Sequence, residues 1–373
     1  MKIIILTGKF GMGHMKAAEA VKENLSNIDD ASIQIIDWID YMTPHYSKYI
    51  YSGYSSLVRC NSFFYNKKYK YSENRPTSQK PGQALMCYLR MSQLIQEEKP
   101  DLIISVLAYA SKAFSYYKNL TGCSIPLITC ITDITAHSEW INICTNAYTV
   151  GSPETKKSLI EKGVPEELIF VSGIPVRHKF SNRTAQRNTR PKVLVMGGGL
   201  GMLPKNMDFY KLLNEAVPAT ITLVTGKNQK LYDKLDQRFE NIHVLGYVEN
   251  IDQYFLDSDL IVTKPGGITT FEAIHSETPI IALNPTLHQE KYNAEFIVEN
   301  GIGEQLTIHD NHQAAMAIAR FINSPSQLEY CKAHMRFIKK GLESCSMQMV
   351  VNDVIRAYLL GGSAGHEIYS FNF

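Results

Sequence analysis

The sequence predicts an α/β fold of two consecutive, doubly wound domains, because the same local pattern opens each half of the chain. A short apolar run, a glycine-rich loop and a helical segment follow one another from residue 3 and again from residue 193. The 373 residues leave room for two domains of ordinary size. The composition, 45% hydrophobic and 20% charged, is that of a globular protein and excludes a disordered or coiled-coil chain.

Short β-branched runs bounded by glycine, proline or polar residues predict the strands. In chain order the runs cover residues 3–6, 33–36, 102–106, 126–131, 147–150 and 169–172, then 193–196, 220–225, 243–245, 260–263 and 279–283. Helices are expected between them, at residues 15–25 after the first glycine loop and at 83–96, where Leu85, Tyr88 and Leu89 share one helical face. Ligands of such sheets bind outside the carboxyl ends of the strands, so we expect both glycine loops to line one cleft.

A polar, basic and proline-containing stretch at residues 173–192 favours a linker. We therefore expect one domain at 1–180 and a second at 188–345, with a helix at about 346–373 that packs back on the first domain. The N-terminus runs straight into a strand, with too few apolar residues for a signal peptide, and no segment is apolar enough to span a bilayer. Seven cysteines without a Cys-x-x-Cys pair are typical of reduced thiols in a cytoplasmic protein.

Neither glycine loop matches a common nucleotide fingerprint. The loop at residues 8–13 has the spacing of a P-loop, but His14 and Met15 stand where lysine and a hydroxyl residue are needed. The loop at 197–201 fails the dinucleotide pattern because Met202 occupies the third glycine position. The acidic pair Asp257 and Asp259 precedes a strand, away from the expected ligand edge, and is interpreted as a solvated turn rather than a metal site.

The segment at residues 260–290 carries the most specific chemistry. A buried strand ends in a Pro-Gly-Gly turn, and Thr269 and Thr270 then lie in the first turn of a helix. The free N–H groups and positive dipole end of that helix suit a diphosphate, and Glu272 one turn later suits ribose hydroxyls. The alternative is a plain strand-to-helix turn with a capping threonine. Gln289 and Glu290 follow another strand and suit a hydroxyl-rich ligand.

Ordered motifs in both halves point to one family. They are Leu6-Thr7-Gly8, Gly11-x-Gly13-His14-x-x-Ala17-Ala18, Pro100-Asp101-Leu102-Ile103-Ile104, Thr132-Asp133-x-x-x-His137-x-x-Trp140, Gly173-Ile174-Pro175-Val176, Gly197-Gly198-Gly199, Gly246-Tyr247-Val248, Thr263-Lys264-Pro265-Gly266-Gly267 and Gln289-Glu290-x-x-Asn293. With these motifs the chain resembles the diacylglycerol glucosyltransferases and monogalactosyldiacylglycerol synthases, in the glycosyltransferase family (family 28) related to the peptidoglycan N-acetylglucosaminyltransferase. One departure is His288, which stands where relatives usually have glycine.

The resemblance implies a GT-B architecture of two Rossmann-like domains and an inverting transfer from a UDP-sugar, without a metal or other cofactor. It implies that the second domain holds the donor and the first domain the acceptor. The implied donor-binding residues are Tyr247 and Val248 at the uracil, Glu272 at the ribose, Gly266, Gly267, Thr269 and Thr270 at the diphosphate, Gln289 and Glu290 at the sugar, and also Gly13, Gly199 and Lys264.

The resemblance places His14 and Asp133 nearest the reaction. An acceptor hydroxyl needs a base, and a histidine at a helix N-terminus stays neutral and suits that task. His14 could instead touch the diphosphate as a donor. Asp133 could be the base, could orient it, or could be an ordinary cap after a strand. His137 and Trp140 are expected to shape the acceptor wall.

The near-neutral total charge of +2 hides a basic segment at residues 41–96, with eight basic residues and the single acid Glu73. Ten aromatic residues lie between Tyr41 and Tyr71 in the same segment. Aromatic rings interleaved with basic residues suit an anionic membrane surface or single-stranded nucleic acid, and no nucleic-acid motif accompanies them. We expect membrane contact through Lys67, Lys68 and Lys70, on the inner face of the cell membrane; the alternative is a solvated, partly disordered loop.

The predicted function is therefore transfer of glucose or galactose from a UDP-sugar to a lipid, foremost 1,2-diacylglycerol. A polyprenyl-linked or secondary-metabolite alcohol is the alternative acceptor. A UDP-N-acetylglucosamine 2-epimerase and a non-catalytic UDP-sugar sensor are the alternatives from other classes.

Overall fold

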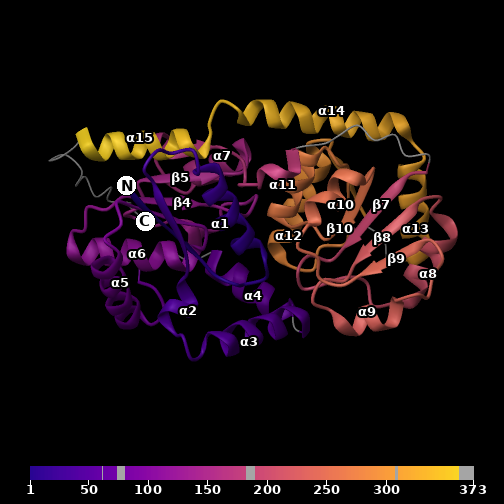
Figure 1. The fold of residues 1–373 in the computed structure, drawn as a ribbon, viewed down its shortest axis with the longest axis horizontal. Coiled ribbons are helices and arrows are strands. Elements are labelled where there is room, and N and C mark those ends of the chain that lie inside the picture. Colours follow the sequence, from indigo (N-terminus) through magenta and orange to yellow (C-terminus); the bar gives the residue numbers. More distant parts are fainter. Residues whose placement is uncertain (61, 74–79, 182–189, 307–309, 361–373) are drawn as a thin grey trace. The chain divides into compact units, whose positions relative to one another are not determined.

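The computed structural model describes residues 1–60, 62–73, 80–181, 190–306 and 310–360 (Figure 1). The side chains of Arg59, Cys60, Ser62 and Lys68 also lie outside the described part. The chain divides into two compact units. Unit 1 contains Met1–Arg177 and the C-terminal helix α15 (Met347–Leu360), and unit 2 is His178–Gly341.

Unit 1 is built on a parallel sheet whose described strands run in the order β2-β1-β3-β4-β5-β6. The strands are β1 (Lys2–Thr7), β2 (Ser32–Asp37), β3 (Leu102–Ser105), β4 (Leu127–Cys130), β5 (Ala147–Val150) and β6 (Ile169–Val171). The helices are α1 (Gly13–Asn24), α2 (Trp38–Met42), α3 (Ser47–Cys60), α4 (Ser62–Glu73), α5 (Ala84–Glu98), α6 (Ala108–Thr121) and α7 (Pro153–Glu161), with short 3₁₀ turns at Ser138–Trp140 and Glu166–Leu168. The order reverses beside β1, so the switch point of this sheet lies between the ends of β1 and β3.

Unit 2 repeats the architecture with the described strands in the order β12-β11-β10-β7-β8-β9. They are β7 (Lys192–Met196), β8 (Thr220–Val224), β9 (Ile242–Leu245), β10 (Leu260–Thr263), β11 (Ile280–Ala282) and β12 (Gly303–Gln305). The helices are α8 (Met207–Ala216), α9 (Gln229–Leu235), α10 (Ile251–Asp257), α11 (Gly267–Ser276), α12 (His288–Glu299), α13 (Asn311–Ile322) and α14 (Pro325–Leu342), after a 3₁₀ turn at His178–Ser181. Its switch point lies between β7 and β10, which pair side by side.

Both sheets are buried between helices, as the apolar strand sequences require. Ile3, Ile4, Ile5 and Leu6 of β1 are fully buried, and so are the central residues of β7 and β10. The predicted fold class is confirmed, and all eleven predicted strands are present within a residue or two of the expected bounds.

Two features differ from the predicted elements. Strand β12 was not predicted, because its sequence Gly-Glu-Gln is polar and its place depends on pairing with β11. Residues 47–60 and 62–73 form the helices α3 and α4, so most of the described part of the basic segment is helical rather than a disordered loop. These helices were not predicted because exposed rings and lysines interrupt the apolar periodicity of their sequences.

No helix in the described part of the chain is both long enough and apolar enough to cross a bilayer.

Candidate active site

His14 lies at the switch point of the unit 1 sheet. The glycine loop at residues 8–13 leaves β1, and His14 is the second residue of α1. Its Nδ1 is 3.3 Å from the hydroxyl oxygen of Thr132, and the ring also hydrogen-bonds the backbone of Val106, just after β3. Burial lowers the pKa of the imidazole, although the nearby Asp133 carboxylate opposes this. The ring is therefore favoured in its neutral, proton-accepting form.

Asp133 comes three residues after β4 and is the electrostatic partner of His14. Burial raises the pKa of its carboxyl, against the opposing effects of His14, Trp140 and His137. The indole N–H of Trp140 donates to its Oδ2 at 3.3 Å. The structure thus brings together the two residues that the resemblance placed nearest the reaction, and it adds Thr132 and Trp140 as groups that orient them.

His137 and Trp140 were expected to shape the acceptor wall, but both side chains are buried, at 4% and 3% exposure. Trp140 packs in the core beside Ile131 and Leu159 and holds Asp133. His137 accepts a hydrogen bond from the Glu139 N–H at Nδ1, so its Nε2 carries the proton and faces the carbonyl of Tyr69 at 3.1 Å. Both residues therefore position neighbouring groups.

Helix α4 is held against the 132–140 loop through Glu73, the single acid of the basic segment. Its carboxylate accepts from the Ser138 N–H at 2.8 Å and pairs with Lys162, and Nε2 of His137 lies 3.3 Å from its Oε2. Burial favours protonated Glu73, but the bonds from Lys162 and Ser138 outweigh it and lower the pKa. A lone acid within a basic segment was the only sequence signal for this contact.

Helix α3 packs in turn on the glycine loop that precedes His14. The ring of Phe10 lies edge-on to Tyr51 and to Tyr54, with 5.0 Å between centroids in each pair. The hydroxyl of Tyr51 donates to Asp37, which also pairs with Lys9 at 3.3 Å. The two helices of the basic segment are therefore attached to the two loops that carry His14 and Asp133.

In unit 2, the turn predicted to bind phosphate lies at the start of α11. Gly266 precedes the helix and offers no side-chain cap to its first N–H groups. Thr269 lies beside Gly266, whereas Thr270 is buried and donates its hydroxyl to the Gly266 carbonyl at 2.9 Å. Gly267 and Glu272 are also buried in α11. Thr269 is thus the better placed of the two threonines to meet a ligand.

The second glycine loop, at residues 197–201, lies beside this turn. A Cβ on Gly198 would come 3.2 Å from Cε of Lys264, and the Gly199 carbonyl accepts from the Lys227 N–H at 3.1 Å. Gly201 has φ +62° and faces the Thr225 carbonyl so closely that a Cβ there would be 1.9 Å from the oxygen. The loop therefore needs glycine for its turn and for its approach to Lys264.

Lys264, in the turn between β10 and α11, forms an ion pair with Glu290 of α12. The distance from Nζ to Oε1 is 2.8 Å. The other oxygen of Glu290 accepts from the N–H groups of Thr286 and Leu287 and from the Thr286 hydroxyl. Burial would raise the pKa of Glu290, but Lys264 and these N–H donors lower it overall. Neither residue was expected to pair with the other.

Three further predicted donor residues of unit 2 lie after β9 or at the start of α12, and the predicted donor residue Gly13 is the first residue of α1 in unit 1. Tyr247 is 40% exposed, and the Lys227 ammonium, which was not among the predicted site groups, lies 5.6 Å from its ring centroid. Val248 and Gln289 are half-buried, at the end of β9 and the start of α12. Asn293, also in α12, donates to the Pro265 carbonyl at 3.0 Å and joins α12 to the turn predicted to bind phosphate.

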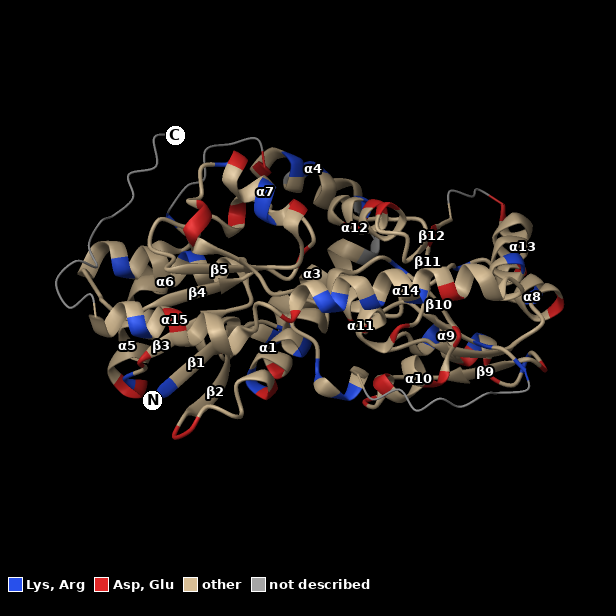
Figure 2. Ribbon diagram, turned by 90° about the horizontal axis from the view of Figure 1, so that it is seen from above, with Lys and Arg blue, Asp and Glu red and all other residues tan. Residues whose placement is uncertain are grey.

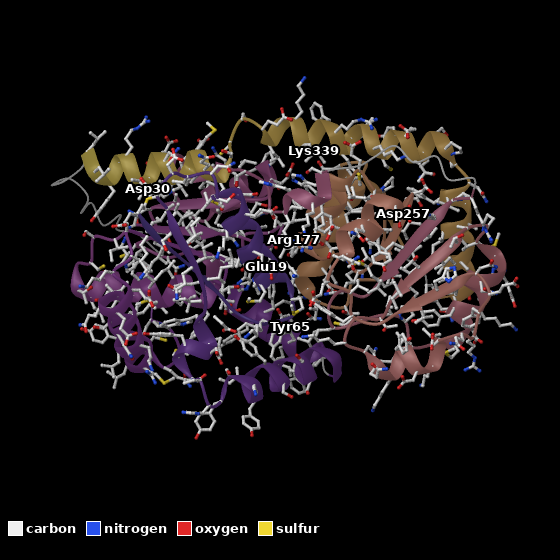
Figure 3. All side chains as sticks on the ribbon, viewed as in Figure 1. Glu19, Asp30, Tyr65, Arg177, Asp257 and Lys339 are labelled. Atoms are coloured by element: carbon white, nitrogen blue, oxygen red, sulfur yellow. The ribbon has the colours of Figure 1, made fainter. Side chains whose placement is uncertain are left out.

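Asp257 and Asp259, which were interpreted as a solvated turn, bind Lys192 where β7 and β10 begin; Asp257 is the last residue of α10. The Lys192 ammonium lies 2.6 Å from Asp257, and its backbone N–H donates to Asp259 at 2.9 Å (Asp257 is labelled in Figure 3). Among the described residues, no three His, Cys, Asp or Glu side chains form a group that could hold a metal ion.

Comparisons with known proteins agree with this architecture. Residues 14–176 match the family described as monogalactosyldiacylglycerol synthase, and residues 205–343 match glycosyl transferases group 1. The processive diacylglycerol β-glucosyltransferase of Staphylococcus aureus (strain bovine RF122 / ET3-1) is 30% identical over 346 residues, 88% of this chain and 86% of that protein. The enzyme of the same description from Staphylococcus carnosus (strain TM300) is 29% identical over 90% of this chain and 87% of its own. The solved structure of the glycotransferase of kitacinnamycin covers 96% of this chain and 99% of its own, with 14% identity and a TM-score of 0.65.

The two sheets have the GT-B architecture, and the family matches identify the chain as a glycosyltransferase. More particularly, the chain belongs to the diacylglycerol glycosyltransferase family, which confirms the resemblance drawn from its motifs.

Proposed function

We propose that this protein transfers a hexose, glucose or galactose, from a UDP-sugar to 1,2-diacylglycerol at the membrane surface, with inversion at the anomeric carbon. The observation that carries the proposal is the family membership, because the relatives over most of the chain are named as processive diacylglycerol β-glucosyltransferases. The groups at the two switch points supply the chemistry that such a transfer needs.

On the donor side, unit 2 offers positive charge for a leaving diphosphate. The uncapped start of α11 presents N–H groups and the positive end of a helix dipole, and Lys264 adds an ammonium beside it. Donors that are in place before reaction stabilise the negative charge that grows on UDP as the sugar leaves. We propose that these groups, rather than a metal ion, neutralise the diphosphate, with Tyr247 at the uracil and Glu272 at the ribose.

On the acceptor side, His14 takes the proton of the attacking hydroxyl. The acceptor oxygen forms a bond to the anomeric carbon while the bond from that carbon to the diphosphate oxygen breaks, and UDP leaves with the electron pair. The lowered pKa of His14 keeps the ring neutral and ready to accept the proton, and Asp133 stabilises the imidazolium that results. In this assignment Asp133 is the partner of the base.

The membrane-facing surface is proposed to be the outer side of α3 and α4. Tyr49 and Phe63 are more than 70% exposed, with Phe64 and Tyr71 exposed beside them. Lys67 and Lys70 are also exposed on α4, where basic residues appear in blue (Figure 2). Rings at headgroup depth and lysines against anionic lipid would give reversible binding at the cytoplasmic face.

Replacing Lys67 and Lys70 together by alanine should weaken binding to vesicles with anionic lipid by roughly 30-fold, at about 1 kcal/mol per lysine. Binding is measured by vesicle co-sedimentation at fixed ionic strength. The paired control is Lys211→Ala with Lys230→Ala, two exposed lysines of unit 2, which should change little. Equal binding of the wild type to neutral and anionic vesicles would refute an electrostatic surface here. Lys68 is left out because its side chain lies outside the described residues.

The direct test of function supplies UDP-glucose or UDP-galactose with diacylglycerol in anionic and in neutral vesicles. We expect a hexosyl-diacylglycerol with the anomeric configuration opposite to that of the donor. Epimerised UDP-N-acetylglucosamine formed without any acceptor would identify an epimerase instead. Binding of UDP-sugar without turnover on any lipid would favour a sensor.

A further inference from the structure

We propose that Glu290 acts on the donor through Lys264: it holds the lysine ammonium at the place of the β-phosphate of UDP. The inference deepens the proposed function and rests on its UDP-sugar donor. Glu290 is thus a positioning residue, and Lys264 is the residue that touches the ligand.

Both oxygens of Glu290 are already occupied by the protein. Oε1 accepts from the Lys264 ammonium at 2.8 Å. Oε2 accepts from the N–H groups of Thr286 and Leu287, at 2.9 and 3.1 Å, and from the Thr286 hydroxyl at 3.1 Å. Glu290 as a residue is 2% exposed, so these protein donors surround most of its carboxylate. Hydrogen bonds from a lysine and from backbone N–H groups to an ionised carboxylate are strong, so the protein itself orders the pair of Glu290 and Lys264.

Lys264, by contrast, has donors to spare and faces the ligand edge. Its side chain is 27% exposed, against 3% for that of Glu290. An ammonium has three N–H donors, and in the described part of the chain one goes to Glu290, which leaves two for a ligand. Without the carboxylate, a four-carbon side chain would have to be ordered by the ligand itself, at a cost in side-chain entropy.

The position of Lys264 identifies the ligand as an anion. Thr263, the residue before it, pairs with Met196, so the lysine and the glycine loop leave the sheet side by side at the switch point. Cε of Lys264 lies 3.2 Å from where a Cβ on Gly198 would be, and two residues later Gly266 opens α11. A cation between a glycine loop and an uncapped helix start is the arrangement that binds phosphate groups.

Calorimetric titration with UDP and with UMP tests the inference, because only UDP carries the β-phosphate. Glu290→Gln removes the charge that holds Lys264 but keeps an oxygen for the Thr286 and Leu287 N–H groups. We expect this variant to bind UDP about tenfold more weakly, since a hydrogen bond to a charged group is lost or misplaced, and to bind UMP within about twofold of wild type. Lys264→Met should give the same selective loss.

The double variant separates action through Lys264 from direct contact. If Glu290 works through the lysine, Glu290→Gln adds little to the UDP defect of Lys264→Met, so the two losses are not additive. The matched control is Glu295→Gln, an exposed carboxylate on the same helix, which should leave both affinities unchanged. Retained UMP binding shows that each variant is folded. If Glu290→Gln does not fold, the UDP-to-UMP affinity ratio of Lys264→Met still tests whether Lys264 contacts the β-phosphate.

Three results would overturn the inference while leaving the proposed function intact. One is Glu290→Gln that binds UDP normally but loses affinity for UDP-glucose, which would mean direct sugar contact. Another is equal loss of UDP and UMP, which would mean a structural role. The third is an unchanged UDP-to-UMP affinity ratio in Lys264→Met. Failure of the wild type to bind either nucleotide would instead refute the proposed function.

Discussion

Replacing His14 by alanine should lower turnover by about 10²- to 10⁴-fold while UDP binding stays close to wild type, because the variant lacks the proton acceptor but keeps unit 2 unchanged. The measurement is a steady-state assay with diacylglycerol vesicles, together with titration of UDP. His312→Ala is the matched control, since His312 is also the second residue of a helix, α13, and is exposed. Turnover near wild type in His14→Ala would remove the assigned base.

The pH dependence gives an independent check on the same residue. A base must be neutral to act, so kcat/KM should fall as the pH drops through the pKa of His14. Burial lowers that pKa below the ordinary 6.5, so the rate is already at its plateau at pH 7 and declines only in more acidic solution. Asp133→Asn removes the charge that opposes burial and should shift the decline to still lower pH. A decline centred above 6.5 would contradict the assignment.

Replacing Gly201 by alanine should unfold or severely destabilise unit 2, by about 3 kcal/mol or more. The new Cβ would lie 1.9 Å from the Thr225 carbonyl oxygen and 2.7 Å from Cβ of Asn228, and φ of +62° disfavours any L side chain. The loop cannot open without losing the bond from the Asn228 side chain to the Gly201 carbonyl. Urea unfolding and UDP titration should both report the loss.

Gly341→Ala is the control for that substitution, because a Cβ at Gly341 meets nothing within 4 Å and the residue lies in the last turn of α14. Its stability should be equal to or slightly greater than wild type, since alanine favours a helix. A Gly201→Ala protein with the unfolding midpoint of wild type would show that the loop is far more adaptable than its contacts indicate.

The parts of the fold that could be predicted from the sequence are segments whose own residues determine their secondary structure. The β1 run Ile-Ile-Ile-Leu is buried whatever surrounds it, and so its strand could be recognised alone. Strand β12 is polar and exists because Ile280–Ala282 pairs with it, which no local pattern encodes. Helices α3 and α4 were missed because rings such as Tyr49 and Phe63 lie on their exposed side.

The candidate site also contains contacts that could be predicted from the sequence and contacts that could not. His14 and Asp133 each follow a strand, so the topology of the sheet brings them together and the sequence could anticipate it. The pairing of Lys264 with Glu290 joins residues 26 positions apart, and that of Glu73 with Lys162 joins residues 89 apart. Such pairs depend on how helices dock, and sequence spacing does not specify docking.

The contact of Phe10 with Tyr51 and Tyr54 couples the stability of α3 to that of the glycine loop before His14. One side of α3 carries exposed groups such as Tyr49, and the other side supports the loop. Coupling between two sites is reciprocal in free energy. A contact that orders α3 from its exposed side therefore favours the ordered form of the loop. By the same coupling free energy, a ligand that orders the loop favours that contact of α3. At the proposed membrane-facing surface, membrane binding would therefore favour the ordered form of the His14 loop.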